Sequence, residues 1–182
     1  SSSVYGESEE VPFREDGPTR PISPYAASKL SAETFCGTYG RLHGLNVTIL
    51  RFFTVYGPRQ RPEMAIHKFT RLIENGGEVP VYGDGTSRRD YTYIDDIVSG
   101  ITSALKKNHS LEVFNLGNSE TVELDRLISV IEEKLGREAK IDRKPMPKGD
   151  VTVTYADVSK AREMLRYEPK TSIGEGVERF VD

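Results

Sequence analysis

Apolar residues recur at helical spacing along much of the chain, and caps or glycines bound most stretches. Ser23 followed by Pro24 gives an N-cap and a first helical residue, which predicts a helix over 24–42 that closes at Gly44. Two shorter helices are expected late in the chain, one capped by Asp157 and one opened by a capping box at 172–175. Between these ends, three apolar stripes predict helices: Ile66, Phe69, Leu72 and Ile73; Ile94, Ile97, Val98, Ile101 and Leu105; Leu124, Leu127, Ile128, Ile131 and Leu135.

One apolar run departs from the helical spacing. Val47–Phe53 is largely apolar and β-branched, which is typical of a strand buried on both faces of a parallel sheet. A helix followed closely by a buried strand is half of a βαβ unit, so the pattern predicts an α/β fold. Residues 7–22 indicate a surface loop, and 57–62 break regular structure at an expected domain crossing. Shorter strands are expected at 79–82, 90–94, 113–116 and 140–144.

Composition narrows the class of protein. With 182 residues and 36% hydrophobic content, the chain is long enough for one ordinary domain core. The 25 Lys+Arg against 28 Asp+Glu give a net charge of −3 without long single-sign blocks, which argues against a nucleic-acid partner. No apolar run approaches the roughly 18–20 residues that span a bilayer, so we expect no membrane partner and a cytoplasmic location.

Cysteine and histidine are too sparse for disulfide or metal chemistry. The lone Cys36 excludes an intramolecular disulfide and a CxxC pair. The three histidines, His43, His67 and His109, are far apart and show no ligand spacing. We therefore expect no metal site.

The usual phosphate-binding loops are missing from the sequence. No GxGxxG or GxxxxGK run occurs, although such runs commonly cradle nucleotide phosphates. The chain opens without methionine on Ser1–Gly6, a small polar run that indicates the end of a strand. Two interpretations follow: the chain is a fragment of a larger protein, or it does not bind a dinucleotide in the common way.

Tyr25 and Lys29 form a candidate acid–base pair in the first turns of the first helix. Residues four apart project from the same helical face, so the phenol and the ammonium can point into one site. A free phenol is a poor base at neutral pH, and a nearby ammonium favours its phenolate form. The YxxxK spacing alone is common, and a surface lysine beside a half-buried tyrosine produces the same pattern.

The surroundings of this pair carry a resemblance. Ser1–Gly6 precedes the pair, and the run LRFFTVYGP at 50–58 follows it. With the motifs at 81–85, 88–91 and 93–96, these segments resemble the extended short-chain dehydrogenase/reductase superfamily, specifically its nucleotide-sugar epimerases and dehydratases, over essentially the whole chain. The resemblance implies an α/β fold: the C-terminal part of a Rossmann-type doubly wound parallel sheet, plus a smaller α/β substrate-binding domain.

The resemblance also implies a domain division and a partner. Residues 1–60, with 94–117 returning to them, would be the C-terminal part of an NAD-binding Rossmann domain. Residues 61–93 and 118–182 would form the nucleotide-sugar substrate domain. Relatives often pair through the helix that matches 24–42, so a homodimer is expected.

Four residues match the family's catalytic and cofactor positions. Tyr25 matches the catalytic base, and Lys29 matches the lysine that holds the nicotinamide ribose and polarises the tyrosine. Ser1 matches the residue that hydrogen-bonds the sugar hydroxyl, three positions before the valine of VYG. Phe52 matches an aromatic position beside the nicotinamide. The implied cofactor is NAD.

Other matches fall on the nucleotide side of the substrate. Tyr82 matches an aromatic near the uracil, and Arg89 an arginine that reaches the diphosphate or ribose. An arginine suits this role because its planar fork holds two phosphate oxygens at once, although a solvated charge in a turn is the alternative. Asp150 matches a ribose contact. Pro147 departs from the family, because many relatives have arginine there, and Lys144 or Lys148 would have to supply the charge.

Local details bear on the sugar. Dehydratases of this kind carry Thr-Asp-Glu before VYG, whereas this chain has Ser1, Ser2 and Ser3, which disfavours water elimination. The run from Thr54 to Met64 looks most like UDP-glucuronate 4-epimerases, in which Thr54, Ser2 and Ser3 would accommodate the sugar carboxylate and Arg61 would lie near the phosphates. Hydroxyl donors suit a carboxylate, which only accepts hydrogen bonds. UDP-glucose 4-epimerases share much of this stretch.

The resemblance therefore implies NAD-dependent epimerisation at C4 of a UDP-sugar, UDP-glucuronate or UDP-glucose/galactose, through a 4-keto intermediate. Two alternatives stay open. One is a truncated, non-catalytic fragment that binds the nucleotide sugar, since the glycine-rich half is not in this sequence. The other is a dehydratase or decarboxylase of the same family.

Overall fold

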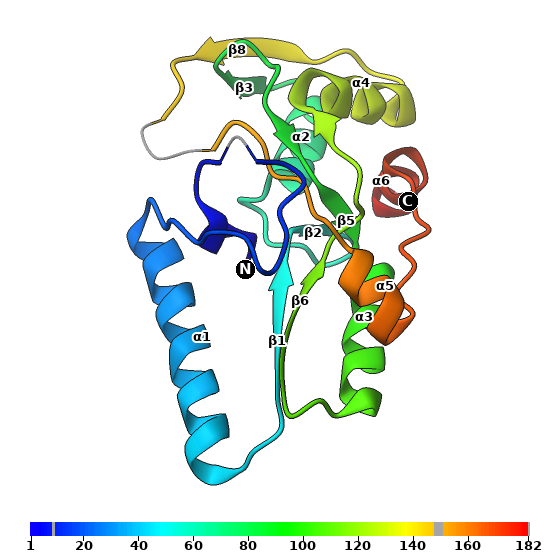
Figure 1. Cartoon of the computed structure of the whole chain (residues 1–182). Helices are drawn as coiled ribbons and strands as arrows, with labels where there is room; N and C mark the ends of the chain where they lie inside the picture. Colours follow the sequence, from blue (N-terminus) through cyan, green and yellow to red (C-terminus); the bar gives the residue numbers. More distant parts are fainter. Residues whose placement is uncertain (9, 148–150, 182) are drawn as a thin grey trace.

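The computed structural model describes residues 1–8, 10–147 and 151–181 (Figure 1). Its helices are the 3₁₀ turn η1 (Ser2–Tyr5), α1 (Pro24–His43), α2 (Ala65–Glu74), α3 (Ile94–Lys107), α4 (Leu124–Leu135), α5 (Ser159–Leu165) and α6 (Ile173–Val181). Its strands are β1 (Val47–Phe52), β2 (Thr54–Tyr56), β3 (Glu78–Tyr82), β4 (Arg88–Arg89), β5 (Tyr91–Tyr93), β6 (Leu111–Leu116), β7 (Val122–Glu123) and β8 (Lys140–Lys144).

The strands β1 and β6 run parallel, in register from Val47 opposite Leu111 to Phe52 opposite Leu116. Figure 1 shows α1 on one side of this pair and α3 with α5 on the other. Helices on both sides of parallel strands are the arrangement of a doubly wound α/β sheet. The predicted α/β class is confirmed.

Three further strand pairs form a second region within the described residues. β2 pairs with β5 and β3 with β8, both parallel, and β4 pairs with β7 antiparallel. The helices α2 and α4 pack against each other, and α6 packs against α4. Since β2 begins two residues after β1 ends, the chain passes directly from the first strand pair into this region.

Local capping sets several helix ends as predicted. The Ser23 side chain accepts a hydrogen bond from the Ala26 N–H, and Gly44 closes α1 in the left-handed region at φ 63°. At α5 the N-cap is Val158, which makes no side-chain cap hydrogen bond, so the predicted cap Asp157 lies one residue too early; its Oδ1 still accepts from the Ser159 N–H at 2.8 Å. Before α6, Ser172 Oγ accepts from the Glu175 N–H at 3.3 Å. The Glu175 carboxylate binds Arg179 at 2.6 Å, so the capping box is replaced at that end by a pair one turn apart.

Two hydrophobic cores underlie the two regions. The first core lies under β1, β6, α3 and α5, and the second under the sheets β2–β5 and β3–β8 with α2, α4 and α6. Buried members of the first core are Val4, Tyr5, Phe13, Phe53, Ile97, Ala104, Phe114, Leu116, Ala156, Val158, Ala161, Leu165 and Tyr167. Those of the second are Tyr56, Ile66, Phe69, Ile73, Val79, Val81, Tyr91, Tyr93, Val122, Leu127, Ile128, Val130, Ile131 and Val177.

Three sequence expectations are wrong. Residues 1–6 were expected to end a strand, but Ser2–Tyr5 form the 3₁₀ turn η1. β1 was expected to be buried on both faces, but of its six residues only the charged Arg51 is fully buried, because its apolar members line an open groove. In α3, Val98 and Leu105 are exposed, at 50% and 77%. The buried residues of α3 are Asp96, Ile97, Gly100 and Ala104, so only Ile97 of the predicted stripe is fully buried. Gly100 fits there because a Cβ would come within 2.9 Å of the Leu116 side chain.

None of the helices in the described ranges is long and apolar enough to cross a membrane.

Candidate active site

The start of α1 places the predicted acid–base pair. Tyr25 is the second residue of the helix, fixed by the Ser23 cap and the proline at its first position. Lys29 lies one turn later, and its Nζ is 5.4 Å from the centroid of the Tyr25 ring. Tyr25 is 57% exposed, so its phenol is open to a ligand. The structure therefore brings the two side chains together, as their spacing predicted.

A groove of about 690 Å³ lies beside α1 and β1, and we call it the Tyr25 groove. Residues from distant parts of the chain line it: Ser1 reaches it from the N-terminal turn, and Arg61 reaches it from the loop before α2. Predicted site residues in its lining are Ser1, Tyr25, Lys29, Phe52 and Arg61. Segments sixty residues apart in sequence thus meet at one surface.

Ser1 reaches this groove from the turn η1. Its hydroxyl oxygen accepts from the Ser3 N–H at 3.3 Å and caps the turn. A hydroxyl that accepts one bond keeps its hydrogen for donation, so Ser1 can still donate to a ligand oxygen. Ser2 and Ser3 follow within the turn and are half-buried, but neither belongs to the lining of the Tyr25 groove.

A second cavity of about 330 Å³ adjoins the groove, and we call it the Thr54 cavity. Thr54, Tyr82 and Arg89, three predicted substrate residues, all line it. Met64 lines both the cavity and the groove, so the two spaces meet at that side chain. The predicted catalytic residues and most of the predicted substrate residues therefore occupy two neighbouring spaces.

Arg61 is on the groove side of that boundary. Its Nε lies 3.3 Å from Glu63 Oε1, and both side chains are largely exposed. A surface ion pair of this kind contributes little to stability, so the guanidinium can exchange Glu63 for an anionic ligand at small cost.

A buried aspartate holds the Thr54 cavity in shape. The backbone oxygen of Asp90 accepts from the Thr54 N–H at 3.0 Å, next to Arg89. Burial raises the pKa of Asp90 to about 6, although its hydrogen bonds oppose that shift. Its carboxylate accepts from four donors: the N–H groups of Asn118 (2.7 Å), Ser119 (3.1 Å) and Ala156 (3.1 Å), and Thr92 Oγ1 (3.1 Å).

Two residues that were expected on the nucleotide side of the site cannot be placed. Asp150 lies outside the described residues, as does Lys148. Lys144, the other proposed source of positive charge, belongs to β8 and pairs with Asp142 at 3.0 Å. The hydrogen bond and charge of Asp142 raise the pKa of the Lys144 ammonium.

Sequence reasoning missed several residues at these spaces. Glu33 lines the Tyr25 groove, and a signal for it was present, since it follows Lys29 by one further helical turn. Arg51 was missed although a single charge in an apolar strand demands a buried partner. Lys68 of α2 lines the Thr54 cavity, and Gln60 lines the groove. No group of three or more His, Cys, Asp and Glu side chains in the described part of the chain is arranged to hold a metal ion.

The parallel β1–β6 pair, with Tyr25 and Lys29 on the flanking helix α1, defines the C-terminal part of a Rossmann-type epimerase or dehydratase fold. The sequence profile of the GDP-mannose 4,6 dehydratase family matches residues 1–180. The chain belongs to that family.

Individual relatives agree with this assignment. An uncharacterized protein of Methanocaldococcus jannaschii is 49% identical over 99% of this chain and 56% of its own length. A UDP-glucuronate 4-epimerase of Thermodesulfobacterium geofontis is 42% identical over 100% and 56%. The structure of UDP-glucuronic acid 4-epimerase from Bacillus cereus with UDP-glucuronic acid and NAD is 39% identical, with a TM-score of 0.95 over 100% of this chain and 58% of that one. The chain thus spans little more than half the length of these relatives.

Proposed function

We propose that this chain forms the catalytic and substrate side of an NAD-dependent UDP-sugar 4-epimerase. The main support for this proposal is that Ser1, Tyr25, Lys29 and Phe52 line one groove, which meets the Thr54 cavity at Met64. A glycine-rich half would supply the remainder of the cofactor site. We call that half together with this chain the complete enzyme.

The lining of the Tyr25 groove fits a nicotinamide nucleotide. The Lys29 ammonium can donate to ribose hydroxyls, and the Phe52 ring offers an apolar face to the nicotinamide. When bound, NAD supplies the hydride chemistry at the sugar C4. The complex of the Bacillus cereus enzyme with NAD supports this cofactor.

The chain's own residues would handle the proton and the oxygen. Tyr25, as phenolate beside Lys29, accepts the proton of the C4 hydroxyl as the 4-keto sugar forms. Ser1 donates a hydrogen bond to the same oxygen throughout. The keto sugar turns over in the site, and Tyr25 returns the proton when the opposite face has been reduced.

The Thr54 cavity would hold the rest of the substrate. Arg89 and Lys68 place positive charge where a diphosphate would lie, and Tyr82, 38% exposed, offers a ring to the base. Thr54 would donate to the sugar carboxylate, which favours UDP-glucuronate as the substrate. A homodimer, expected from the resemblance, stays a prediction.

Parallel assays test the proposal. The complete enzyme is incubated with UDP-glucuronate and, separately, with UDP-glucose, and the C4 epimers are quantified by chromatography. We expect turnover of UDP-glucuronate and NAD retained after purification, read from absorbance of the denatured supernatant. Absence of any C4 epimer from either sugar would overturn the proposal.

Binding without catalysis is a second candidate, because the chain spans only about 56% of its relatives. It predicts that the 182-residue chain binds UDP-glucuronate by calorimetry but retains no NAD. The intact mass of the natural protein separates the two candidates directly, since a 20.4 kDa product lacks room for the glycine-rich half.

A further inference from the structure

A buried arginine, Arg51, lies near the C-terminal end of β1. Arg51 is 5% exposed, and its Nη2 lies 2.8 Å from Glu33 Oε2 on α1. Its Nε also donates to both carboxylate oxygens of Glu33, at 3.1 and 3.2 Å. Such fork-like contacts fix direction as well as distance. The pair therefore sets how α1 lies against β1.

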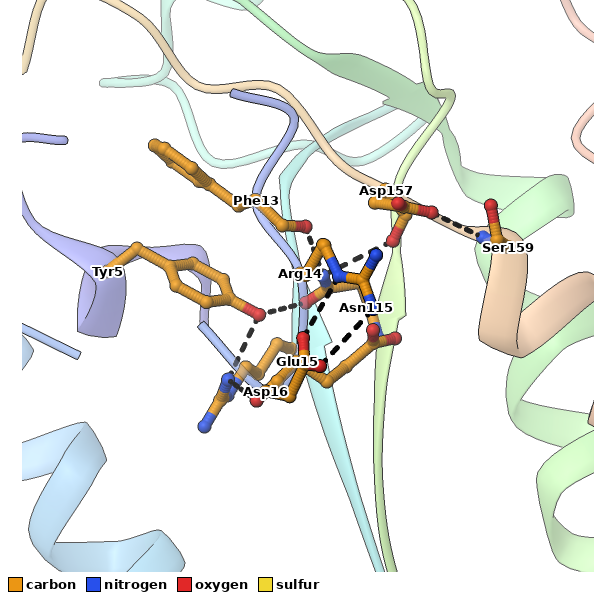
Figure 2. A network of polar contacts seen from close by, with 9 residues as sticks. Tyr5, Phe13, Arg14, Glu15, Asp16, Asn115, Asp157 and Ser159 are labelled. Carbon is orange, nitrogen blue, oxygen red and sulfur yellow. Dashed lines mark hydrogen bonds and ion pairs between the residues drawn. The ribbon is translucent and has the colours of Figure 1, made fainter. Parts of the chain in front are cut away.

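The same guanidinium reaches the N-terminal turn. Arg51 Nη1 donates to the Tyr5 hydroxyl at 2.9 Å, and the guanidinium carbon lies 4.9 Å from the centre of the Tyr5 ring. The Tyr5 hydroxyl in turn donates to Asn115 Oδ1 at 2.7 Å, as Figure 2 shows. Asn115 is fully buried and lies opposite Arg51 in the β1–β6 register. One cation thus connects η1, α1, β1 and β6.

The two elements that Arg51 joins carry the proposed catalytic groups. Glu33 follows Lys29 by four residues and Tyr25 by eight, so all three lie along one face of α1 and line the Tyr25 groove. Tyr5 ends the short turn that Ser1 caps. Ser1 and Tyr25 are therefore held, from two directions, by the same guanidinium.

Stability alone is a poor reason for this arrangement. Both members of a buried ion pair lose their hydration, and proteins in which well-packed apolar residues replace such a pair are often equally or more stable. Positioning is a better reason, because a shift of about 1 Å between reacting groups can cost roughly 100-fold in rate.

We propose that Arg51 is a positioning residue for the reaction: through Glu33 and Tyr5 it fixes the separation between Ser1 and the Tyr25–Lys29 pair. The inference rests on the proposed function. Arg51 itself lines neither the Tyr25 groove nor the Thr54 cavity, so it acts only through these two residues.

The test uses Tyr5→Phe and Glu33→Gln in the complete enzyme. The first removes one hydroxyl and keeps the ring, and the second removes one charge and keeps the shape. We expect Glu33→Gln to lower kcat about 10- to 100-fold and Tyr5→Phe to lower it less, with KM for the UDP-sugar within about threefold of wild type. Binding is spared because neither residue belongs to the Thr54 cavity.

Glu112→Gln is the matched control. It makes the same chemical change at a pair with Lys160, 2.6 Å long, whose two members do not line the groove. Hydrogen exchange of residues 1–6 and 24–33 is followed in all variants. We expect faster exchange in both segments for Glu33→Gln and Tyr5→Phe but not for Glu112→Gln.

The outcomes separate the two proposals. Folded Tyr5→Phe and Glu33→Gln variants with wild-type kcat and unchanged exchange would overturn the positioning role, as would equal losses in Glu112→Gln. A wild-type enzyme without epimerase activity would overturn the proposed function. In that case the exchange data still decide whether Arg51 holds the two elements together.

Discussion

The Tyr25 groove and the Thr54 cavity are each braced by a buried charge, and the two charges are stabilised differently. Beside the groove, the Arg51 cation faces the Glu33 anion. Beside the cavity, the Asp90 anion is held by three backbone N–H groups and the Thr92 hydroxyl. One brace is an ion pair, and the other is a carboxylate among neutral donors.

This difference has consequences for protonation. Burial disfavours the charge on Arg51, but the hydrogen bonds and charges of Glu33 and Tyr5 outweigh it and raise the pKa of the guanidinium, so the cation persists at any ordinary pH. For Asp90 burial is the larger effect, and its pKa rises to about 6. A counter-charge keeps a buried group ionised, whereas neutral donors leave it close to titration. We therefore expect the charge of Arg51 beside the groove to be independent of pH, and the charge of Asp90 beside the cavity to change with pH.

The largest expected effect breaks the groove alone. Replacing Tyr25 by Phe keeps the ring and removes the hydroxyl that is proposed to exchange the proton, so kcat should fall about 10²- to 10⁴-fold while KM changes little. Steady-state kinetics of the complete enzyme measure both constants, with circular dichroism to show that the fold is kept. Retention of more than about a tenth of kcat would exclude Tyr25 as the base.

A smaller effect is expected in the cavity. Thr54→Val keeps shape and removes one hydroxyl donor, and a hydrogen bond to a charged group contributes about 1.5–3 kcal/mol. We expect kcat/KM for UDP-glucuronate to fall roughly 10- to 150-fold, and that for UDP-glucose to fall less, because its hydroxymethyl group is a weaker acceptor. Equal losses for both sugars would show that Thr54 does not contact the carboxylate.

The smallest expected effect is the pH response of Asp90. Its folded pKa of about 6 lies above the ordinary 3.8, so the folded state gains a proton that the unfolded state lacks between these values. Stability from this group is therefore present at low pH and is lost as pH rises through 6. The unfolding free energy of wild type minus that of Asp90→Asn should therefore increase by about 1 kcal/mol from pH 7 to pH 5.

Urea unfolding of the complete enzyme at pH 5, 6 and 7 measures this change. Asp84→Asn is the control, because hydrogen bonds from Thr86 lower the pKa of the exposed Asp84 and place its titration below this range. A constant difference for Asp90→Asn across the three pH values would show that Asp90 does not titrate there.

The amino-acid sequence alone determined the features that depend on near neighbours. The Ser23–Pro24 start and the Gly44 end of α1 were predicted, and with them the common face of Tyr25 and Lys29. Helical geometry repeats every few residues, so short-range spacing is enough to place such pairs. Family-specific motifs extended this to the fold class, which the profile match and the relatives confirm.

Tertiary structure alone decided which distant residues meet. The hydrogen bonds and ion pair that connect Glu33, Arg51, Tyr5 and Asn115 join positions as far as 110 residues apart, and no periodic pattern in the sequence predicts them. Similarly, α3 buries Gly100 and Ala104 and exposes Leu105, because close approach to α5 and to the Leu116 side chain favours small side chains over large apolar ones. Packing geometry is a property of two surfaces at once, so one segment's sequence specifies its own helix but not the partner that the helix will face.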